Sequence, residues 1–243
     1  MSAKRLIIVT GSKGGTGKSL VARYLADRYE REGVEMTRVD ADADVAQLHQ
    51  YYDDTIDLHP DNIADILSIV ESARSQVVLL DMPGRGLNDL AIANREASIF
   101  EWLEREGVKI TMLNVLSPFR ASTASVRQML DAISDTSVKP IALLNRRFGP
   151  SDEHWALWTG NARLAIDESP TRTRLREQGG QEVFIPEIRA LVPILLDLTT
   201  ETFQSALHSS TPQFKTAALK QYLRTWLRNM DAALRPIEKE LGL

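Results

Sequence analysis

A stretch of nine residues near the amino terminus combines glycines, lysines and hydroxyl side chains at spacings that suit a bound polyphosphate. It reads Gly11, Ser12, Lys13, Gly14, Gly15, Thr16, Gly17, Lys18 and Ser19. Glycines let the chain turn tightly and let backbone N–H groups approach an anion without a Cβ in the way. In such a loop Lys18 bridges the β- and γ-phosphates, and the Ser19 hydroxyl is a ligand of Mg²⁺. The sequence therefore predicts a phosphate-binding loop in which residues 14–19 hold the nucleotide.

A carboxylate is expected beside this loop. The apolar residues 77–80 are followed by Asp81, and Pro83 and Gly84 come soon after. In phosphate-loop proteins a carboxylate at the end of a neighbouring strand holds the Mg²⁺ shell. We therefore interpret Asp81 as a metal-linked residue. The alternative is a strand end without a ligand, because four apolar residues followed by Asp is a weak pattern on its own.

Three more carboxylates, those of Asp40, Asp42 and Asp44, alternate at the end of another predicted strand. They would repel one another unless a cation or ordered hydrogen-bond donors lay nearby. The pattern favours a functional segment close to the phosphates over a surface turn that has no function. For Asp42 the alternative is a solvated carboxylate, and we assign no role to Asp44.

The residues after the fifth predicted strand bear on the base of the nucleotide. Proteins that read guanine use Asn-Lys-x-Asp there, and the Asp accepts the N–H groups of guanine. In this chain Asn145 is followed by Arg146, and Phe148 stands where that Asp would be. We therefore expect adenine, paired through Asn145, so that the predicted cofactors are ATP and Mg²⁺. A strand-end asparagine without a ligand is the alternative.

The elements that must position these residues follow from the apolar pattern. Strands are predicted at residues 5–10, 35–40, 76–81, 109–116, 139–144 and 182–185. Helices are predicted at residues 18–32, 63–73, 88–106, 121–133, 170–178 and 214–241, the last bent at Pro236. Apolar runs that alternate with segments of helical period are typical of a parallel sheet with crossover helices. We expect an α/β fold: a single doubly wound, mostly parallel sheet flanked by helices. Residues 1–212 form the predicted ATPase domain, and residues 213–243 form a C-terminal helical extension packed on or near it.

The composition excludes several classes of protein. The 243 residues are 43% hydrophobic and 26% charged, which is enough apolar material for a sizeable core. A net charge of -4 argues against a chain that coats nucleic acid through bulk charge alone. The chain has no cysteine, which excludes disulfides, thiolate metal sites and iron–sulfur ligands. Its apolar runs are far shorter than the roughly 20 residues of a membrane span, and we predict a cytoplasmic protein.

The predicted C-terminal helix is amphipathic and basic. Residues 214–236 contain five cations and one carboxylate, a local charge of +4, and their apolar residues recur at helical spacing. Three interpretations stay open: a helix docked on its own domain with a solvated basic face, nonspecific DNA binding, and anchoring on a membrane surface. Membrane contact is the least favoured, because residues 238–240 are not basic and a single helix binds lipid weakly.

Several of these motifs together resemble one family. Residues 13–19, KGGTGKS, resemble the deviant Walker A motif KGGxGK[ST] of the ParA/MinD family of ATPases. Asp81 with Pro83 resembles the family's Walker B motif, and Asp40 with Asp42 lies where its first switch carries D-x-D. Residues 183–187, which include Pro186, resemble the family's last strand and the turn against the base. The resemblance implies that Asp40 lies near the Mg²⁺ shell, that Asp42 orients the attacking water, and that Pro186 lies beside the base.

The same resemblance implies an ATP-dependent homodimer with slow hydrolysis in the absence of a partner. Lys13 would reach the phosphates of the opposite subunit. Because the chain lacks cysteine, we expect the branch that positions large cargo, such as plasmid or chromosome partition, division-site placement and conjugative transfer. The expected partners are nonspecific DNA or a small DNA-binding adaptor that stimulates hydrolysis, which would make the protein nucleoid-associated. The residues around Tyr51 and Tyr52 look somewhat like members from plasmid transfer regions.

Two other classes of function stay open. The first is an ATP-dependent ligase or kinase of the same fold that acts on a small molecule. Lys13 distinguishes this class, because the metabolic relatives generally do not need a lysine that acts across a dimer. The second is a binding module that has lost hydrolysis and uses ATP only to set its shape.

Overall fold

The computed structural model describes residues 3–11, 14–42, 48–84 and 86–243. Within these residues seven strands form one sheet in which every neighbouring pair is parallel. In spatial order they are β3 (Ile56–Asp57), β2 (Met36–Asp40), β4 (Val77–Asp81), β1 (Arg5–Thr10), β5 (Lys109–Leu116), β6 (Lys139–Asn145) and β7 (Gln181–Ile185). The predicted fold class is confirmed, and the short edge strand β3 is an element that the sequence pattern did not indicate.

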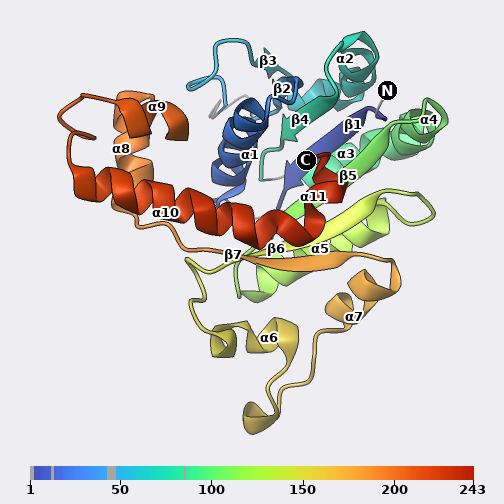
Figure 1. Cartoon of the computed structure of the whole chain (residues 1–243). Coiled ribbons are helices and arrows are strands. Elements are labelled where there is room, and N and C mark those ends of the chain that lie inside the picture. Colours follow the sequence, from blue (N-terminus) through green and yellow to red (C-terminus); the bar gives the residue numbers. More distant parts are fainter. Residues whose placement is uncertain (1–2, 12–13, 43–47, 85) are drawn as a thin grey trace.

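Helices cover both faces of the sheet (Figure 1). They are α1 (Lys18–Glu32), α2 (Ile66–Ser72), α3 (Gly86–Ala97), α4 (Ile99–Arg105), α5 (Arg120–Ala132), α6 (Ala156–Thr159), α7 (Pro170–Glu177), α8 (Leu191–Thr199), α9 (Phe203–His208), α10 (Ala217–Leu234) and α11 (Glu238–Leu241). Short 3-10 turns lie at Pro60–Asp65, Asp152–Trp155, Ala162–Leu164 and Arg235–Ile237.

The central strands are buried on both faces, which explains their continuous apolar sequences. In β1, Ile7 and Val9 pack in the hydrophobic cluster under α1, whereas Leu6 and Ile8 pack in the cluster on the opposite face. Because β1 lies between β4 and β5, the chain that leaves β1 emerges beside the end of β4. The strand order therefore brings the glycine-rich segment and Asp81 to the same edge of the sheet.

Three predicted helices differ from the observed ones, and one of these, predicted to begin at Phe214, begins at Ala217. The single helix predicted at residues 88–106 is wrong, because the chain breaks at Ser98, whose φ of 49° is left-handed. A new helix starts there, and the Asn94 side chain accepts a hydrogen bond of 2.9 Å from the Phe100 N–H. The helix predicted to begin at Ile63 begins instead at Ile66, after a 3-10 turn.

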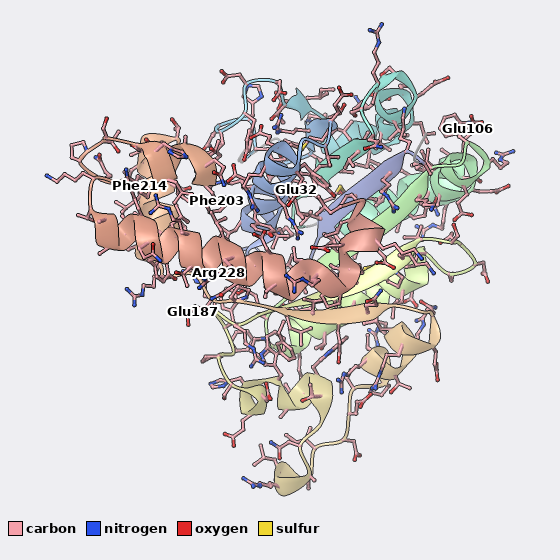
Figure 2. All side chains as sticks on the ribbon, in the orientation of Figure 1. Glu32, Glu106, Glu187, Phe203, Phe214 and Arg228 are labelled. Carbon is pink, nitrogen blue, oxygen red and sulfur yellow. The ribbon has the colours of Figure 1, made fainter. Side chains whose placement is uncertain are left out.

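The C-terminal helix packs on α1 and belongs to the same hydrophobic cluster as β1 (Figure 1). Trp226 of α10 meets the rings of Tyr24 and Phe203, with centroids 6.0 Å and 5.2 Å away. The Tyr24 hydroxyl donates a 2.6 Å hydrogen bond to Asp231. Figure 2 labels Phe203, at the start of α9, and Phe214, three residues before α10, and both rings are buried. The apolar face of α10 is therefore docked on the protein's own core, as one of the three interpretations expected.

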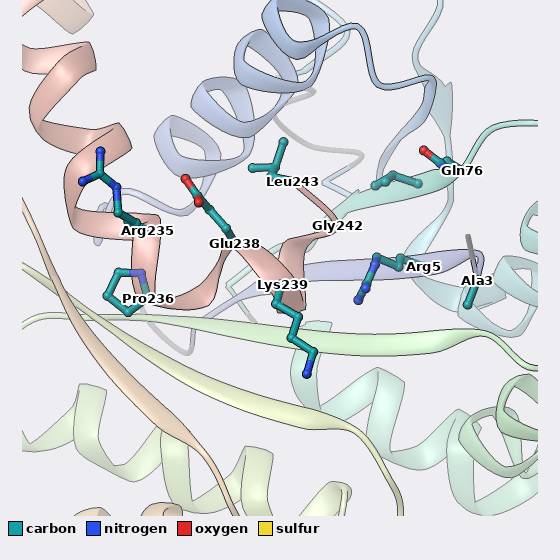
Figure 3. Close-up of a pocket in the computed structure, with 10 residues that line it drawn as sticks. Ala3, Arg5, Gln76, Arg235, Pro236, Glu238, Lys239, Gly242 and Leu243 are labelled. Carbon is teal, nitrogen blue, oxygen red and sulfur yellow. The ribbon is translucent and has the colours of Figure 1, made fainter. Parts of the chain in front are cut away.

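The amino edge of the sheet is closed by the last residues of the chain. Figure 3 shows Arg5, at the start of β1, beside Gly242 in a cavity of about 560 Å³. Arg5 donates to the Glu240 carbonyl at 3.2 Å, and Thr111 donates to the same oxygen at 2.7 Å. This cavity lies at the opposite edge from the glycine-rich segment and contains none of the predicted site residues. In the part of the chain that is described, no helix combines the length and the apolar character that crossing a membrane would require.

Candidate functional site

The glycine-rich segment joins β1 to the amino terminus of α1. Gly17 stands directly before the helix with a φ of 99°, and as the N-cap residue it offers α1 no side-chain cap. A Cβ at Gly17 would lie 2.8 Å from the side-chain nitrogen of Asn145, so the close approach of β6 as well as the backbone conformation requires glycine. The backbone N–H groups and the positive end of the helix dipole at this terminus are suited to an anion.

Asp81 lies at the floor of this segment and is completely buried. Its register partners are Val9 of β1 and Asp40 of β2, so three strand ends meet here. Neither carboxylate oxygen has a hydrogen-bond partner among the described residues. Burial raises the pKa of Asp81 to about 7, and the charge of Asp40 adds to this, while the Ser19 hydroxyl and Lys18 act in the opposite direction. A buried carboxylate with two open oxygens is suited to a cation or its bound water.

Lys18 and Ser19 occupy the first turn of α1, next to Asp81. Lys18 is 7% exposed, and burial lowers the pKa of its ammonium group, while the charges of Asp81 and Asp42 oppose that shift. The two residues therefore bring one cation and one hydroxyl to the place where the sequence predicts phosphate and metal.

Asp40 and Asp42 take different positions. Asp40 is buried and accepts hydrogen bonds from the backbone N–H groups of Asp42 and Leu48, at 3.0 Å and 2.7 Å. Burial raises the pKa of Asp40, and these two hydrogen bonds counteract the shift. Asp40 thus fastens the chain on both sides of residues 43–47, whereas Asp42 is half-buried and faces the cavity described below. Asp44 and Lys13 lie outside the described residues.

A cavity of about 300 Å³ opens over the glycine-rich segment. It is lined by Gly14, Gly15, Gly17, Lys18, Ser19, Leu20, Arg23, Asp42, Gly84, Asn145, Arg147, Phe148, Pro193 and Asp197. Asp81 and Asp40 are buried and are not part of its lining. The structure therefore brings most of the predicted residues to one concave site at the carboxyl edge of the sheet, where open α/β sheets bind ligands.

Asn145 and Pro186, both predicted to meet the base, lie in different surroundings. Asn145 lines the cavity, donates a 2.9 Å hydrogen bond to the Thr16 carbonyl and accepts one of 3.0 Å from the Arg147 N–H. Pro186 is not among the lining residues, and its carbonyl accepts a 3.4 Å hydrogen bond from the Trp226 indole.

Sequence reasoning missed the contribution of Arg23 and of α8 to this cavity. Arg23 follows Ser19 by four residues, so helical periodicity alone could have placed both side chains on one face of α1. Pro193 and Asp197 come from a largely apolar segment that carried no recognisable motif, and only the packing of α8 brings them here.

The donors at this site fit magnesium. Ser19 and Asp81 offer oxygen ligands, and Mg²⁺ usually takes one or two protein oxygens together with phosphates and waters. Among the residues with described positions, no group of three or more His, Cys, Asp or Glu side chains gathers to enclose a metal. One hydroxyl and one carboxylate leave coordination positions of such a cation for phosphate oxygens and waters.

Comparisons with known proteins agree with this geometry. The curated protein "Protein MobD" of Acidithiobacillus ferrooxidans is 24% identical over 192 residues, which cover 76% of this chain and 79% of that protein. The solved structure of the septum site-determining protein MinD of Pyrococcus horikoshii OT3, complexed with Mg-ADP, has a TM-score of 0.55 at 14% identity and covers 98% of each chain. The MinC:MinD cell division complex of Aquifex aeolicus has a TM-score of 0.51 at 15% identity, over 93% of this chain and 96% of that chain.

The two structures show a shared fold, and the decisive match is to a family model. The model described as the CobQ/CobB/MinD/ParA nucleotide binding domain matches residues 7–164, well over half of the 243 residues. That range contains the glycine-rich segment, Asp40, Asp81 and Asn145. The chain belongs to the CobQ/CobB/MinD/ParA family of nucleotide-binding domains.

Proposed function

We propose that the chain is a Mg²⁺-dependent ATPase that forms a homodimer with ATP and positions DNA or another large cargo. The observation that carries the proposal is the buried Asp81, which lies beside Ser19 and Lys18 and whose carboxylate oxygens have no hydrogen-bond partner among the described residues. Such a carboxylate costs stability in the empty protein, which is understandable if a cation completes the site.

Each residue of the site has a role in this proposal. The backbone N–H groups of residues 14–19 and the Lys18 ammonium bind the phosphates. Ser19 and Asp81 hold Mg²⁺, which neutralises charge on the phosphate oxygens when it is bound. Asp42 orients the attacking water, and Asp40 holds the segment that carries Asp42 in place. Asn145, whose Nδ2 has a second N–H beyond the one given to Thr16, faces the adenine.

Dimerisation belongs to the proposal because the loop begins with Lys13. In this scheme Lys13 neutralises charge on the partner's nucleotide, and the loss of the γ-phosphate removes the contacts that favour the dimer. A ligase or kinase would instead turn over ATP only with its small-molecule substrate and would form no nucleotide-dependent dimer.

The proposed cargo is DNA, bound by the basic face of α10. Arg224 and Arg228 are exposed on this face and form no ion pair with any residue in the described ranges. Guanidinium groups that project into solvent along one helix can contact successive phosphates of a nucleic acid. Among the cargo-positioning roles, the similarity to Protein MobD favours one related to mobilisation over partition.

The direct test is ATP turnover by the purified protein with Mg²⁺. Lys18→Ala and Asp81→Asn should each abolish it, because they remove the phosphate contact and the metal-linked carboxylate. Asp27→Asn is a matched control, since Asp27 is also buried with a pKa of about 7 but faces Tyr52, away from the cavity. Turnover by Lys18→Ala and Asp81→Asn at the parent rate would refute the site assignment.

A second measurement separates the classes of function. Size-exclusion chromatography with ATP and with ADP should show a dimer with ATP alone. A monomer under both conditions would favour the ligase or kinase class.

A further inference from the structure

Arg23 is a buried cation in the wall of the nucleotide cavity. It lies four residues after Ser19, about one turn along α1, so both side chains are on the same face of the helix. Its side chain is 4% exposed, yet it lines the cavity together with Gly17 and Ser19. The phosphate-loop motif does not call for an arginine at this position.

The guanidinium group is held by residues from two other parts of the chain. One nitrogen, Nη1, donates a 3.0 Å hydrogen bond to Asp197 of α8. The guanidinium carbon lies 3.4 Å from the centre of the Tyr51 ring, and the Tyr51 hydroxyl also donates to Asp197. These contacts fix the head of the arginine, so little conformational freedom remains to be lost on binding a ligand.

The second terminal nitrogen of Arg23 has a different environment. Nη2 is buried and has no hydrogen-bond partner among the residues that the structure describes. Asp197 compensates the charge only partly, because its side chain is 55% exposed to solvent. A buried guanidinium N–H without an acceptor is costly, and an anionic oxygen in the cavity would remove that cost.

We propose that Arg23 is a further nucleotide-binding residue whose Nη2 donates a hydrogen bond to an oxygen of the phosphate chain. The inference rests on the proposed function, since it assumes that a nucleotide occupies this cavity. Helical side chains lean toward the amino terminus of their helix, so Arg23 is directed toward the turn that carries Ser19, at the phosphate end. Asp197 and Tyr51 act through Arg23 as positioning residues.

Calorimetric titration of MgADP and of AMP into the parent, Arg23→Gln, Arg23→Lys and Arg28→Gln tests the proposal. Arg23→Gln should weaken the binding of MgADP at least about tenfold, as expected for a lost charge-assisted hydrogen bond. Arg23→Lys should recover only part of this, because lysine keeps the charge but lacks the second donor. An equal loss for AMP and MgADP places the contact at the α-phosphate, and a loss for MgADP alone places it at the β-phosphate.

Arg28→Gln is the matched control. Arg28 lies on the same helix, is 5% exposed and also has buried nitrogens without a hydrogen-bond partner in the described structure, but it pairs with Glu238, away from the cavity. The Arg28→Gln substitution should lower the melting temperature and leave the affinity for MgADP unchanged.

The inference would be overturned if Arg23→Gln bound MgADP within twofold of the parent. A lower melting temperature of Arg23→Gln with unchanged affinity would show that Arg23 has a structural role alone. If the parent itself fails to bind MgADP, the proposed function fails, whereas loss of binding in Lys18→Ala but not in Arg23→Gln rejects only the role of Arg23.

Discussion

The side chain of Asn145, at the end of β6, donates a 2.9 Å hydrogen bond to the carbonyl of Thr16 in the glycine-rich segment. Its oxygen accepts a second hydrogen bond, of 3.0 Å, from the Arg147 N–H, so both ends of the amide are engaged. The residue that the sequence assigns to the base therefore also supports the glycine-rich segment that we propose as the phosphate loop.

Replacing Asn145 by Ala should weaken both the fold and the binding of nucleotide. The loss of a buried hydrogen bond lowers the free energy of unfolding by about 1–3 kcal/mol, and we expect MgADP affinity to fall about tenfold because the loop loses its support. Urea denaturation and calorimetry measure the two effects. Asn94→Ala removes a comparable hydrogen bond, to Phe100, far from the loop, and should affect stability alone. Equal nucleotide affinity in the two variants would argue against a supporting role for Asn145.

Asp81 should make the stability of the empty protein depend on pH. Its pKa is about 7 in the folded state and about 3.8 without the fold, so the folded state retains the proton where the unfolded state has lost it. The free energy of unfolding therefore falls as pH rises from about 4 to 7, by up to about 4 kcal/mol for this group. Asp81→Asn should be more stable than the parent at pH 8, and the difference should vanish near pH 4.

Thermal unfolding from pH 4 to 8 with and without MgADP checks this. Asp27→Asn should show a similar gain at pH 8, because the pKa of Asp27 is also raised to about 7 by burial. MgADP should stabilise Asp27→Asn as much as the parent, but Asp81→Asn much less. A pH profile of Asp81→Asn that runs parallel to that of the parent would contradict the shifted pKa.

The protein should bind random-sequence DNA through the basic face of α10 in the presence of ATP. The double variant Arg224→Glu with Arg228→Glu should weaken binding more than tenfold and reduce the salt dependence, because fewer counterions are released. Mobility shifts at two salt concentrations measure this. Arg95→Glu with Arg105→Glu, two exposed positions on α3 and α4, makes the same change of charge elsewhere and serves as the control. Equal loss of binding in both double variants would show an effect of net charge rather than of this face.

Trp226→Ala should destabilise the whole protein rather than the tail alone. The side chain is 3% exposed and packs between Tyr24 and Phe203, so its removal should cost about 3–5 kcal/mol. Urea denaturation followed by circular dichroism should show one transition at a lower midpoint. A separate early transition, with the main midpoint unchanged, would mean that α10 folds and unfolds independently.

The sequence by itself determined the parts of this protein that depend on neighbouring residues. The glycine-rich segment with Lys18 and Ser19 predicts a phosphate loop from the sequence alone. The signal is local, because backbone sterics and helix polarity act within a few residues. The strand boundaries at residues 5–10 and 109–116 agree with β1 and β5, since strands buried on both faces read as unbroken apolar runs. The pattern at Asp81 was interpretable for the same reason: the residue directly follows such a run.

Only the tertiary structure decided which distant residues meet. The strand order places Asp40 beside Asp81, the end of β6 brings Asn145 to Thr16, and the packing of α8 brings Asp197 to Arg23. The break at Ser98 likewise has no local signal, since serine rarely takes a left-handed conformation without support from its surroundings. These contacts join residues up to 174 positions apart, and their partners are selected by the burial of whole faces of helices and strands rather than by local spacing.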